Sequence, residues 1–454
     1  MDDAYYAGSG LRNDTLMGTT FETRVWDKLH MALTGYQHTN KGEGLWFTPY
    51  VPSPNGVPVS VRTTEYNIDR SGEIANFDVE LFSANTLKFG LWHEDNTFDQ
   101  ARRFYAVASA TSFPSPYSFL SNPFYTQWQD TFKTTTNQYW LSDDWDVTDA
   151  LTLTAGFKGL RVTTDGTAQI GTMPSGTIES KKNFLPQVGA NFKLSNTDEL
   201  FASYSKNMRA FQAAATGTTP FATTIAGFNA IRNSLKPETS DDIEAGWRTQ
   251  ARLYEATLAA YLVNFHDRLL SVQSGSGIQG NPVVLSNVGG VRSYGLEAAL
   301  SLRLQPGLTW TNSFSESRST YRDNVTSGAD VIAIKGKHVV DAPDTMLKSI
   351  LGYDNGSLFG DLGADFMSTR YYSYTNDASV PSRLLMNASA GYRFPAFAMV
   401  RQSSVQLNVT NLTNRRYIST LGSNGFVSSD PNGTAQTLLP GAPREWTLTF
   451  AAKF

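Results

Sequence analysis

The amino-acid sequence predicts an all-β protein whose fold is a transmembrane antiparallel β-barrel. Three observations support this prediction. Apolar and polar residues alternate along most of the chain, and short links alternate with long polar ones. No stretch approaches the roughly 18 consecutive apolar residues that a membrane-spanning helix needs. A barrel also explains a hydrophobic content of only 40%, because half of every strand faces a wet lumen.

The period-two alternation places apolar side chains on one face of each expected strand. It is clearest over residues 87–92, 151–158, 242–248, 293–303, 358–366, 384–393 and 405–410. The chain ends in the same way with PREWTLTFAAKF, which places on one face Trp446, Leu448, Phe450, Ala452 and Phe454. We expect these side chains to face lipid. Gly295, two residues before Glu297, is expected to face the lumen, where a side chain would crowd the interior.

The links between the expected strands are of two kinds. Short turn-like links occur at 26–28, 83–86, 146–150, 195–199, 305–307 and 353–357. Long polar loops are expected at 41–59, 96–130, 164–181, 209–235, 272–283, 322–340 and 420–437. About 17 strands fit between Thr15 and Phe454. If Phe454 lies at the periplasmic end, the link at 394–400 is periplasmic and the loop at 420–437 is extracellular.

Composition and motifs exclude several classes of function. The net charge of -4 and the lack of a Lys/Arg-rich run argue against nucleic-acid binding. The chain has no cysteine, and its five histidines have no metal-ligand spacing. We find no phosphate-binding, zinc-protease or nucleophile-elbow motif, so we expect no catalytic site, no metal site and no enzyme activity.

Five phrases of the sequence resemble the barrel of TonB-dependent outer-membrane receptors, and they occur in that family's order. They are FLPQVGANFKLSNTDELFASYSKNMRAF (184–211), LKPETSDDIEAGWR (235–248), NVGGVRSYGLEAALSLRL (287–304), NVTNLTNRRYIST (408–420) and GAPREWTLTFAAKF (441–454). Each phrase alone tracks strand and turn chemistry, so we expect most of these residues to serve folding. The resemblance extends more loosely over residues 1–454, which we interpret as one receptor-like barrel domain.

The resemblance implies a 22-stranded barrel, closed by an N-terminal plug, that imports scarce ligands such as ferric siderophores. It also implies energy from TonB, which acts on a short N-terminal TonB box. The start MDDAYYAGSG has no signal-peptide anatomy, and no TonB box or plug-like segment precedes the first expected strand. About 17 strands would place Thr15 near the start of the sixth strand of such a barrel. We therefore expect an N-terminally truncated barrel without the plug, which would engage the TonB complex only through the missing region.

Ligand recognition is expected from extracellular loops and from lumen-facing residues near the outer rim. Ferric siderophores are often anionic and partly aromatic, so Arg beside Tyr suits them. The candidate residues are Arg209, Arg232, Arg370, Tyr371 and Tyr372. In the alternative interpretation, the tyrosines belong to the interfacial aromatic belt and the arginines contact the rim or lipopolysaccharide. The chelator would hold the iron, so we expect no cofactor. The expected surroundings are the lipid and lipopolysaccharide of a Gram-negative outer membrane.

Three other interpretations remain open from the sequence. A passive porin-like channel would also lack a plug, although the five phrases favour the receptor family. A non-transporting barrel remnant, or a structural or adhesive barrel, would fit a chain that begins at Met1. A β-rich soluble protein of the cytosol would fit the missing signal peptide.

Overall fold

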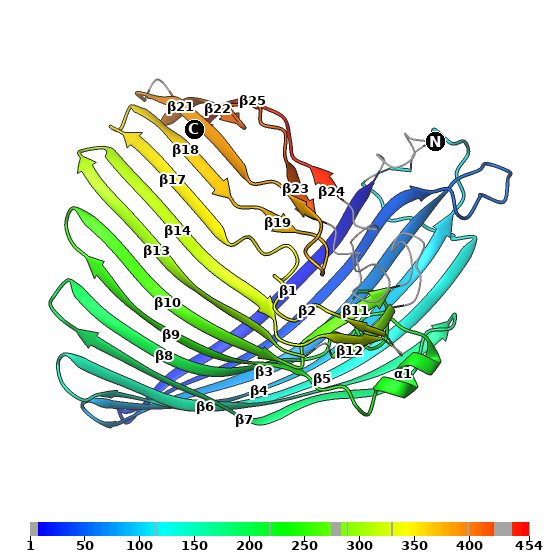
Figure 1. The fold of residues 1–454 in the computed structure, drawn as a ribbon, viewed down its shortest axis with the longest axis horizontal. Coiled ribbons are helices and arrows are strands. Elements are labelled where there is room, and N and C mark those ends of the chain that lie inside the picture. Colours follow the sequence, from blue (N-terminus) through cyan, green and yellow to red (C-terminus); the bar gives the residue numbers. More distant parts are fainter. Residues whose placement is uncertain are drawn as a thin grey trace.

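A 17-stranded antiparallel sheet forms almost the whole molecule and curls into a barrel wall (Figure 1). The structure is a computed structural model that describes residues 8–453, apart from 113, 116, 218, 274–282, 288, 328–329, 397–398 and 422–437. The strands of the sheet are β1 (Ser9–Val25), β2 (Leu29–Thr48), β3 (Ser60–Phe82), β4 (Asn85–Tyr105), β5 (Tyr125–Asp146), β6 (Leu151–Ile170), β7 (Gly176–Lys193), β8 (Asp198–Arg209), β9 (Glu238–Gln250), β10 (Tyr254–His266), β13 (Val291–Gln305), β14 (Leu308–Tyr321), β17 (Thr345–Asp354), β18 (Leu358–Met367), β21 (Arg383–Phe394), β22 (Gln402–Thr410) and β25 (Glu445–Lys453).

Smaller elements lie in the links between the main strands. They are the hairpins β11 (Leu269–Gln273) with β12 (Val283–Asn287), β15 (Val325–Ser327) with β16 (Asp330–Ile332), β19 (Arg370–Tyr371) with β20 (Ser379–Val380), and β23 (Ile418–Leu421) with β24 (Leu438–Pro440), and the helix α1 (Ile225–Ile231). Thr224 caps α1 by accepting a hydrogen bond from the amide of Gly227. No helix among the residues described has the length and apolar character needed to cross a membrane.

Each main strand pairs with the next one along the chain, so the sheet is a continuous meander from β1 to β25. The strand count agrees with the prediction. Among the described residues, no ladder joins β1 to β25. Phe454, which the sequence placed at the periplasmic end, lies outside the described residues.

The registers confirm the predicted outward face. On the last two strands, Val409 lies opposite Trp446, Leu407 opposite Leu448 and Val405 opposite Phe450. Leu448 and Phe450 are 72% and 70% exposed, which suits side chains that contact lipid rather than a protein core. The other face of the same strands carries Thr447, Thr449 and Lys453. Because a barrel in lipid must turn its apolar face outward, this second face lines the lumen.

Gly295 shows how tightly the lumenal face is packed. It lies on β13 between Tyr261 of β10 and Ser317 of β14. A Cβ atom placed on Gly295 would lie 2.2 Å from the backbone oxygen of Glu316 and 2.9 Å from the Tyr261 hydroxyl. Only glycine fits at this position, because a side chain would collide with these atoms, as the sequence predicted.

The two ends of the barrel differ as predicted, with tight turns at one end and the small hairpins and α1 at the other (Figure 1). In the first turn, Trp26 and Asp27 adopt φ angles of 51° and 57°. Two successive positive φ angles are typical of the primed turns that match strand twist in two-residue hairpins. The turn between β21 and β22 includes residues 397–398, which lie outside the described part of the chain.

Three predicted extracellular loops are in large part strand. The predicted loop at 41–59 contains the end of β2, the one at 96–130 contains the ends of β4 and β5, and the one at 164–181 contains those of β6 and β7. These extensions carry polar residues on both faces, such as Asp99 and Gln100 on β4, and their apolar residues occur on either face, so the regular apolar–polar alternation disappears although backbone pairing continues. The prediction was wrong there because a strand above the membrane no longer needs an apolar face.

The link between β8 and β9, residues 210–237, packs on the lumenal face of this extension. Phe221 lies with its ring centroid 5.1 Å from that of Phe132 on β5 and 5.3 Å from that of Phe228 on α1. The wall is hollowed to receive them, since a Cβ atom at Gly166 would lie 2.4 Å from the Phe221 ring. The buried cluster contains Trp128, Phe132, Ile178, Phe211, Ala215, Phe221 and Phe228.

Asp130 lies beside this cluster and is 1% exposed. It faces Gln100 across the β4–β5 ladder, and its Oδ2 has no hydrogen-bond partner among the residues described. Burial raises the pKa of this carboxyl to about 7. Arg102, the nearest basic residue along the facing strand, is itself buried over Trp128. Burial lowers the pKa of the Arg102 guanidinium, because this group is also removed from water. The Asp130 carboxyl is therefore neutral at pH values below about 7.

The protonation of Asp130 should make stability depend on pH. The folded pKa lies near 7 and the unfolded value near 4, so between these pH values only the folded state keeps the proton. Stability therefore falls as pH rises through this window, by roughly 2–4 kcal/mol. We expect the urea midpoint to be lower at pH 8 than at pH 5, and Asp130→Asn to remove most of that difference. Asp69→Asn, at an exposed carboxyl on β3, is the control and should leave the pH dependence intact.

Replacing Gly295 by alanine should destabilise the barrel by about 1–3 kcal/mol, because the added carbon meets backbone that cannot give way. Gly35→Ala on β2 is the matched control, since a Cβ atom there meets nothing within 4 Å. The stability of each variant is measured as the urea concentration at which half of the protein has lost its heat-modifiable gel mobility. Equal midpoints for the two would contradict the packing argument.

Candidate functional site

The lumenal wall from β8 to β14 is built mostly of small and hydroxyl side chains. Small and polar residues suit the inward face of a barrel, although the larger Phe201 and Tyr261 also face inward beside glycines. The registers place one row of the inward-facing residues side by side across the sheet: Phe201 on β8, Gly246 on β9, Ala259 on β10, Glu297 on β13 and Ser315 on β14. This wall is a smooth polar surface against which a hydrophilic body can pack or move.

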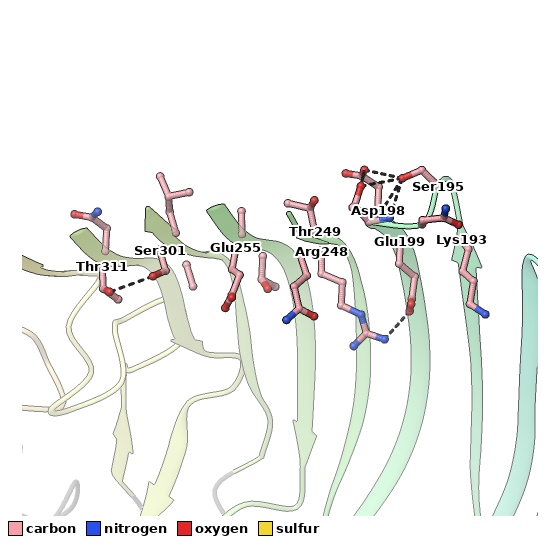
Figure 2. Close-up of a pocket in the computed structure, with 17 residues that line it drawn as sticks. Lys193, Ser195, Asp198, Glu199, Arg248, Thr249, Glu255, Ser301 and Thr311 are labelled. Carbon is pink, nitrogen blue, oxygen red and sulfur yellow. Dashed lines mark hydrogen bonds and ion pairs between the residues drawn. The ribbon is translucent and has the colours of Figure 1, made fainter. Parts of the chain in front are cut away.

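At the end with the tight turns, the wall forms a cavity of about 710 Å³ (Figure 2). Arg248 of β9 forms an ion pair of 2.5 Å with Glu199 of β8, and Ser301 and Thr311 lie 3.4 Å apart between their hydroxyl oxygens. Figure 2 shows Lys193, Glu199, Arg248 and Glu255 pointing away from the turns, along the wall. The cavity therefore offers both charge signs and several hydroxyls to whatever occupies the lumen.

The turn above this cavity is held by its own hydrogen bonds. The carboxylate of Asp198 accepts from the hydroxyls of Ser195 and Thr197 and from the indole nitrogen of Trp247. The Ser195 hydroxyl in turn accepts from the Asp198 amide at 3.1 Å. The SNTDE phrase is thus a rigid turn, as its sequence predicted, and its polar groups are already paired.

A polar network occupies the lumenal face of the first strands. His38 lies 2.5 Å from Asp14 through Nε2, and its Nδ1 accepts from the Arg70 guanidinium at 2.9 Å. A neighbouring group joins Trp92, Tyr36 and Glu94. Sequence reasoning missed these residues, although their positions on the polar side of the alternation were visible. Their partners lie tens of residues away, and only the register shows the pairing.

Two of the predicted ligand-binding residues flank the inward-packed link. Arg209 is the last residue of β8, on the lumenal face opposite Glu238, and it is exposed. Arg232 follows α1 directly and is also exposed. Neither guanidinium forms an ion pair within the part of the chain that the structure describes. Both guanidinium groups lie at the end of the barrel opposite the tight turns.

The other three predicted residues belong to a separate group of links. Arg370 is 6% exposed, pairs with Asp341 at 2.7 Å and donates to the backbone oxygen of Ile418 at 3.0 Å. The ring of Tyr371 lies 5.5 Å from that of His338, and both Tyr371 and Tyr372 are partly buried. The structure keeps these three together, in hairpin β19–β20 and just after β19, but away from α1 (Figure 1).

The described residues contain no cluster of three or more His, Asp or Glu side chains that would hold a metal ion. Several ionisable groups of the lumen form pairs of opposite charge, as in Arg248 with Glu199 and Arg303 with Glu255. Such pairs present both charge signs on this part of the wall.

Comparison with solved structures finds many related barrels. The ferric citrate transporter FecA in the unliganded form has a TM-score of 0.71 at 16% identity, with 98% of this chain and 62% of that chain covered. BauA, the ferric preacinetobactin receptor from Acinetobacter baumannii, has a TM-score of 0.67 at 19% identity, with 98% and 64% covered. The copper transporter OprC has a TM-score of 0.71 at 13% identity, with 99% and 67% covered.

These likenesses establish the fold, and the chain spans less than two thirds of the length of FecA and BauA. No curated protein matches the sequence. The matched structures are receptors and transporters rather than enzymes, in line with the expected lack of a catalytic site. The family model described as TonB dependent receptor-like, beta-barrel matches residues 2–412, so the chain belongs to this family of receptor barrels.

Proposed function

We propose that this chain is the barrel portion of an outer-membrane receptor that takes up a ferric siderophore or a similar scarce ligand with energy from TonB. The observation that carries the proposal is the two-faced sheet. Its lumenal face is small and polar, its outward face is apolar, and its strands superpose on receptors of ferric citrate and ferric preacinetobactin over 98% of the chain.

Coupling to TonB is proposed for the whole receptor. This chain covers 62% of the length of FecA and 64% of the length of BauA. Edges β1 and β25 need hydrogen-bond partners in lipid, because an unpaired strand edge there is costly. The additional length of these relatives is enough to supply further strands and a domain inside the lumen. The charged cavity near the tight turns suits contact with such a domain.

Ligand binding is proposed at the opposite end. Arg209 and Arg232 present two exposed cations on either side of the link 210–237, and charge-assisted hydrogen bonds to an anionic chelate are strong. Tyr371 and Tyr372 supply aromatic surface from the neighbouring links. Arg370 belongs to this proposal only as a support, because its guanidinium already binds Asp341 and a backbone oxygen.

A first experiment tests the location. The protein is expressed in a Gram-negative host and followed by membrane fractionation and heat-modifiable gel mobility. The proposal expects a detergent-extracted species in the outer membrane fraction. A form that stays soluble without detergent would overturn it and favour the soluble β-rich alternative.

A second experiment tests the ligand. Ferric citrate, a ferric catecholate and Cu²⁺ are titrated into the purified protein while tryptophan fluorescence is recorded. We expect a ferric chelate to bind, and Arg209→Ala and Arg232→Ala each to weaken binding about tenfold or more, the loss of one charged hydrogen bond. Arg161→Ala, a loss of the same charge on the outward side of β6, should leave the affinity unchanged. Preference for Cu²⁺, or equal effects of all three variants, would contradict the assignment.

Arg370→Ala should first loosen the packing between the links, and any effect on ligand binding should follow from that change. The change removes an ion pair and a backbone contact that join three links, and it should cost about 1–3 kcal/mol locally. We expect faster proteolysis within 368–382 and 411–421, with Arg370→Lys intermediate. Unchanged proteolysis together with lost ligand binding would show that Arg370 contacts the ligand itself.

A further inference from the structure

A second cavity, of about 520 Å³, lies on the outward side of the sheet rather than in the lumen. Its floor is formed by Glu43 of β2, Glu65 of β3, Arg103 of β4 and Gln129 of β5, which share one face through the registers. That face is the one that carries the lipid-facing residues Leu33 and Leu91 lower down, so this cavity opens away from the barrel axis.

The height of the cavity follows from the strand geometry. On β2 the exposed outward apolar residues end at Leu33, because Leu45 and Phe47 further on are buried in a cluster with the links, and Glu43 lies ten residues beyond Leu33. At about 3.3 Å per residue and a tilt near 45°, this is roughly 23 Å further along the membrane normal. The cavity therefore lies above the hydrocarbon layer, at the height of whatever covers the outer leaflet.

The link between β4 and β5 forms a roof over this floor. The amide of Leu120 donates to the Glu43 carboxylate at 3.1 Å, and Lys41 lies 4.9 Å from the centroid of the Phe119 ring. Glu43 is 3% exposed, and burial raises its pKa, so the roof amide compensates a carboxylate that has lost water. The link and the strand face below it therefore enclose a cavity together.

The polar groups of the floor form a continuous chain. Arg103 pairs with Glu65 and donates to the Gln129 amide oxygen at 3.1 Å. Gln129 donates to Gln169 at 2.9 Å, and Gln169 donates to Thr131 at 2.7 Å. Such a chain fixes the orientation of each amide and leaves its second donor or acceptor position for a ligand. Pre-oriented amides beside an aromatic ring, here Phe119, suit a molecule with many hydroxyl groups.

The charges exclude other ligand classes. The lining has three carboxylates, Glu43, Glu65 and Asp99, against two cations, and both cations are already engaged, Arg103 by Glu65 and Lys41 by Phe119. A phosphate would meet a net negative lining. The floor consists of charged and amide side chains, which an acyl chain would leave without hydrogen-bond partners, and no metal-binding cluster occurs in the described part of the chain.

We propose that this outward cavity binds an uncharged sugar unit of the lipopolysaccharide that surrounds the barrel, with Gln129, Gln169 and Phe119 as the contacting residues. The proposal rests on the outer-membrane placement proposed above. It assigns to the lipid-facing side of the barrel a recognition site that is independent of the ligand in the lumen.

The test uses lipid-free core oligosaccharide, released from lipopolysaccharide by mild acid and dephosphorylated, as the probe. Binding to the detergent-purified protein is measured by calorimetry. We expect saturable binding that Gln129→Ala and Gln169→Ala each weaken about tenfold, and that Phe119→Ala also weakens. Gln138→Ala is the matched control, because Gln138 lies on the same strand as Gln129 but on the lumenal face. It should bind the oligosaccharide as the unaltered protein does.

Several results would overturn the proposal: no binding of the oligosaccharide, equal binding of all variants, or equal binding of inorganic phosphate with the same dependence on Gln129. Heat-modifiable mobility of each variant separates lost binding from lost folding. Membrane fractionation and ferric-chelate titration address the proposed receptor function alone. A protein that fractionates with the outer membrane and binds a ferric chelate, but not the sugar, would therefore sink only this inference.

Discussion

A strand inside a lipid bilayer must place every backbone N–H and C=O group in a ladder, because no water is available to satisfy them. The continuous meander from β1 to β25 is the direct consequence of this constraint. The sheet can then have only two faces, one in contact with lipid and one with the lumen. Trp446 and Leu448 occupy the first, while Thr447 and Thr449 occupy the second, and this division governs every other feature of the barrel wall.

Above the lipid the constraint is relaxed, and the same strands behave differently. β2 to β6 continue for many residues with polar side chains on both faces, among which lie buried apolar side chains such as Phe47 and Phe132. The links then provide the apolar contacts that lipid provided lower down. One cluster around Phe47, Val61 and Tyr105 packs on the outward face, and one around Phe132 and Phe221 packs on the lumenal face. Buried carboxyls such as Glu43 and Asp130 occur in this region because the links exclude water there.

The sequence was sufficient for the strand number, the two faces and the family, because each of these follows from local alternation and turn chemistry. It was insufficient for the strand ends. Lys41 and Glu43 share a face with Leu29 and Leu33, and nothing in their residue types marks them as strand. Pairing between distant residues was also invisible. The sequence predicts both Arg370 and Arg209 as ligand-binding residues and does not distinguish them. The partners of Arg370, Asp341 and Ile418, lie 29 and 48 residues away along the chain.

The arginines show why position decides function in this barrel. Arg370 lies where three links meet, and its guanidinium donates to Asp341 and to the backbone oxygens of Ile418 and Ser419, so it stabilises the loop arrangement. Arg103 lies on the outward face, where Glu65 and Gln129 hold it as part of a floor. Arg209 lies where β8 ends on the lumenal side, with no neighbouring carboxylate in an ion pair among the described residues. A guanidinium that the fold leaves unpaired at the mouth of a polar lumen retains its full capacity for an anion. The search for ligand-binding residues should therefore begin from exposed, unpaired cations at strand ends and not from arginine–tyrosine phrases in the sequence.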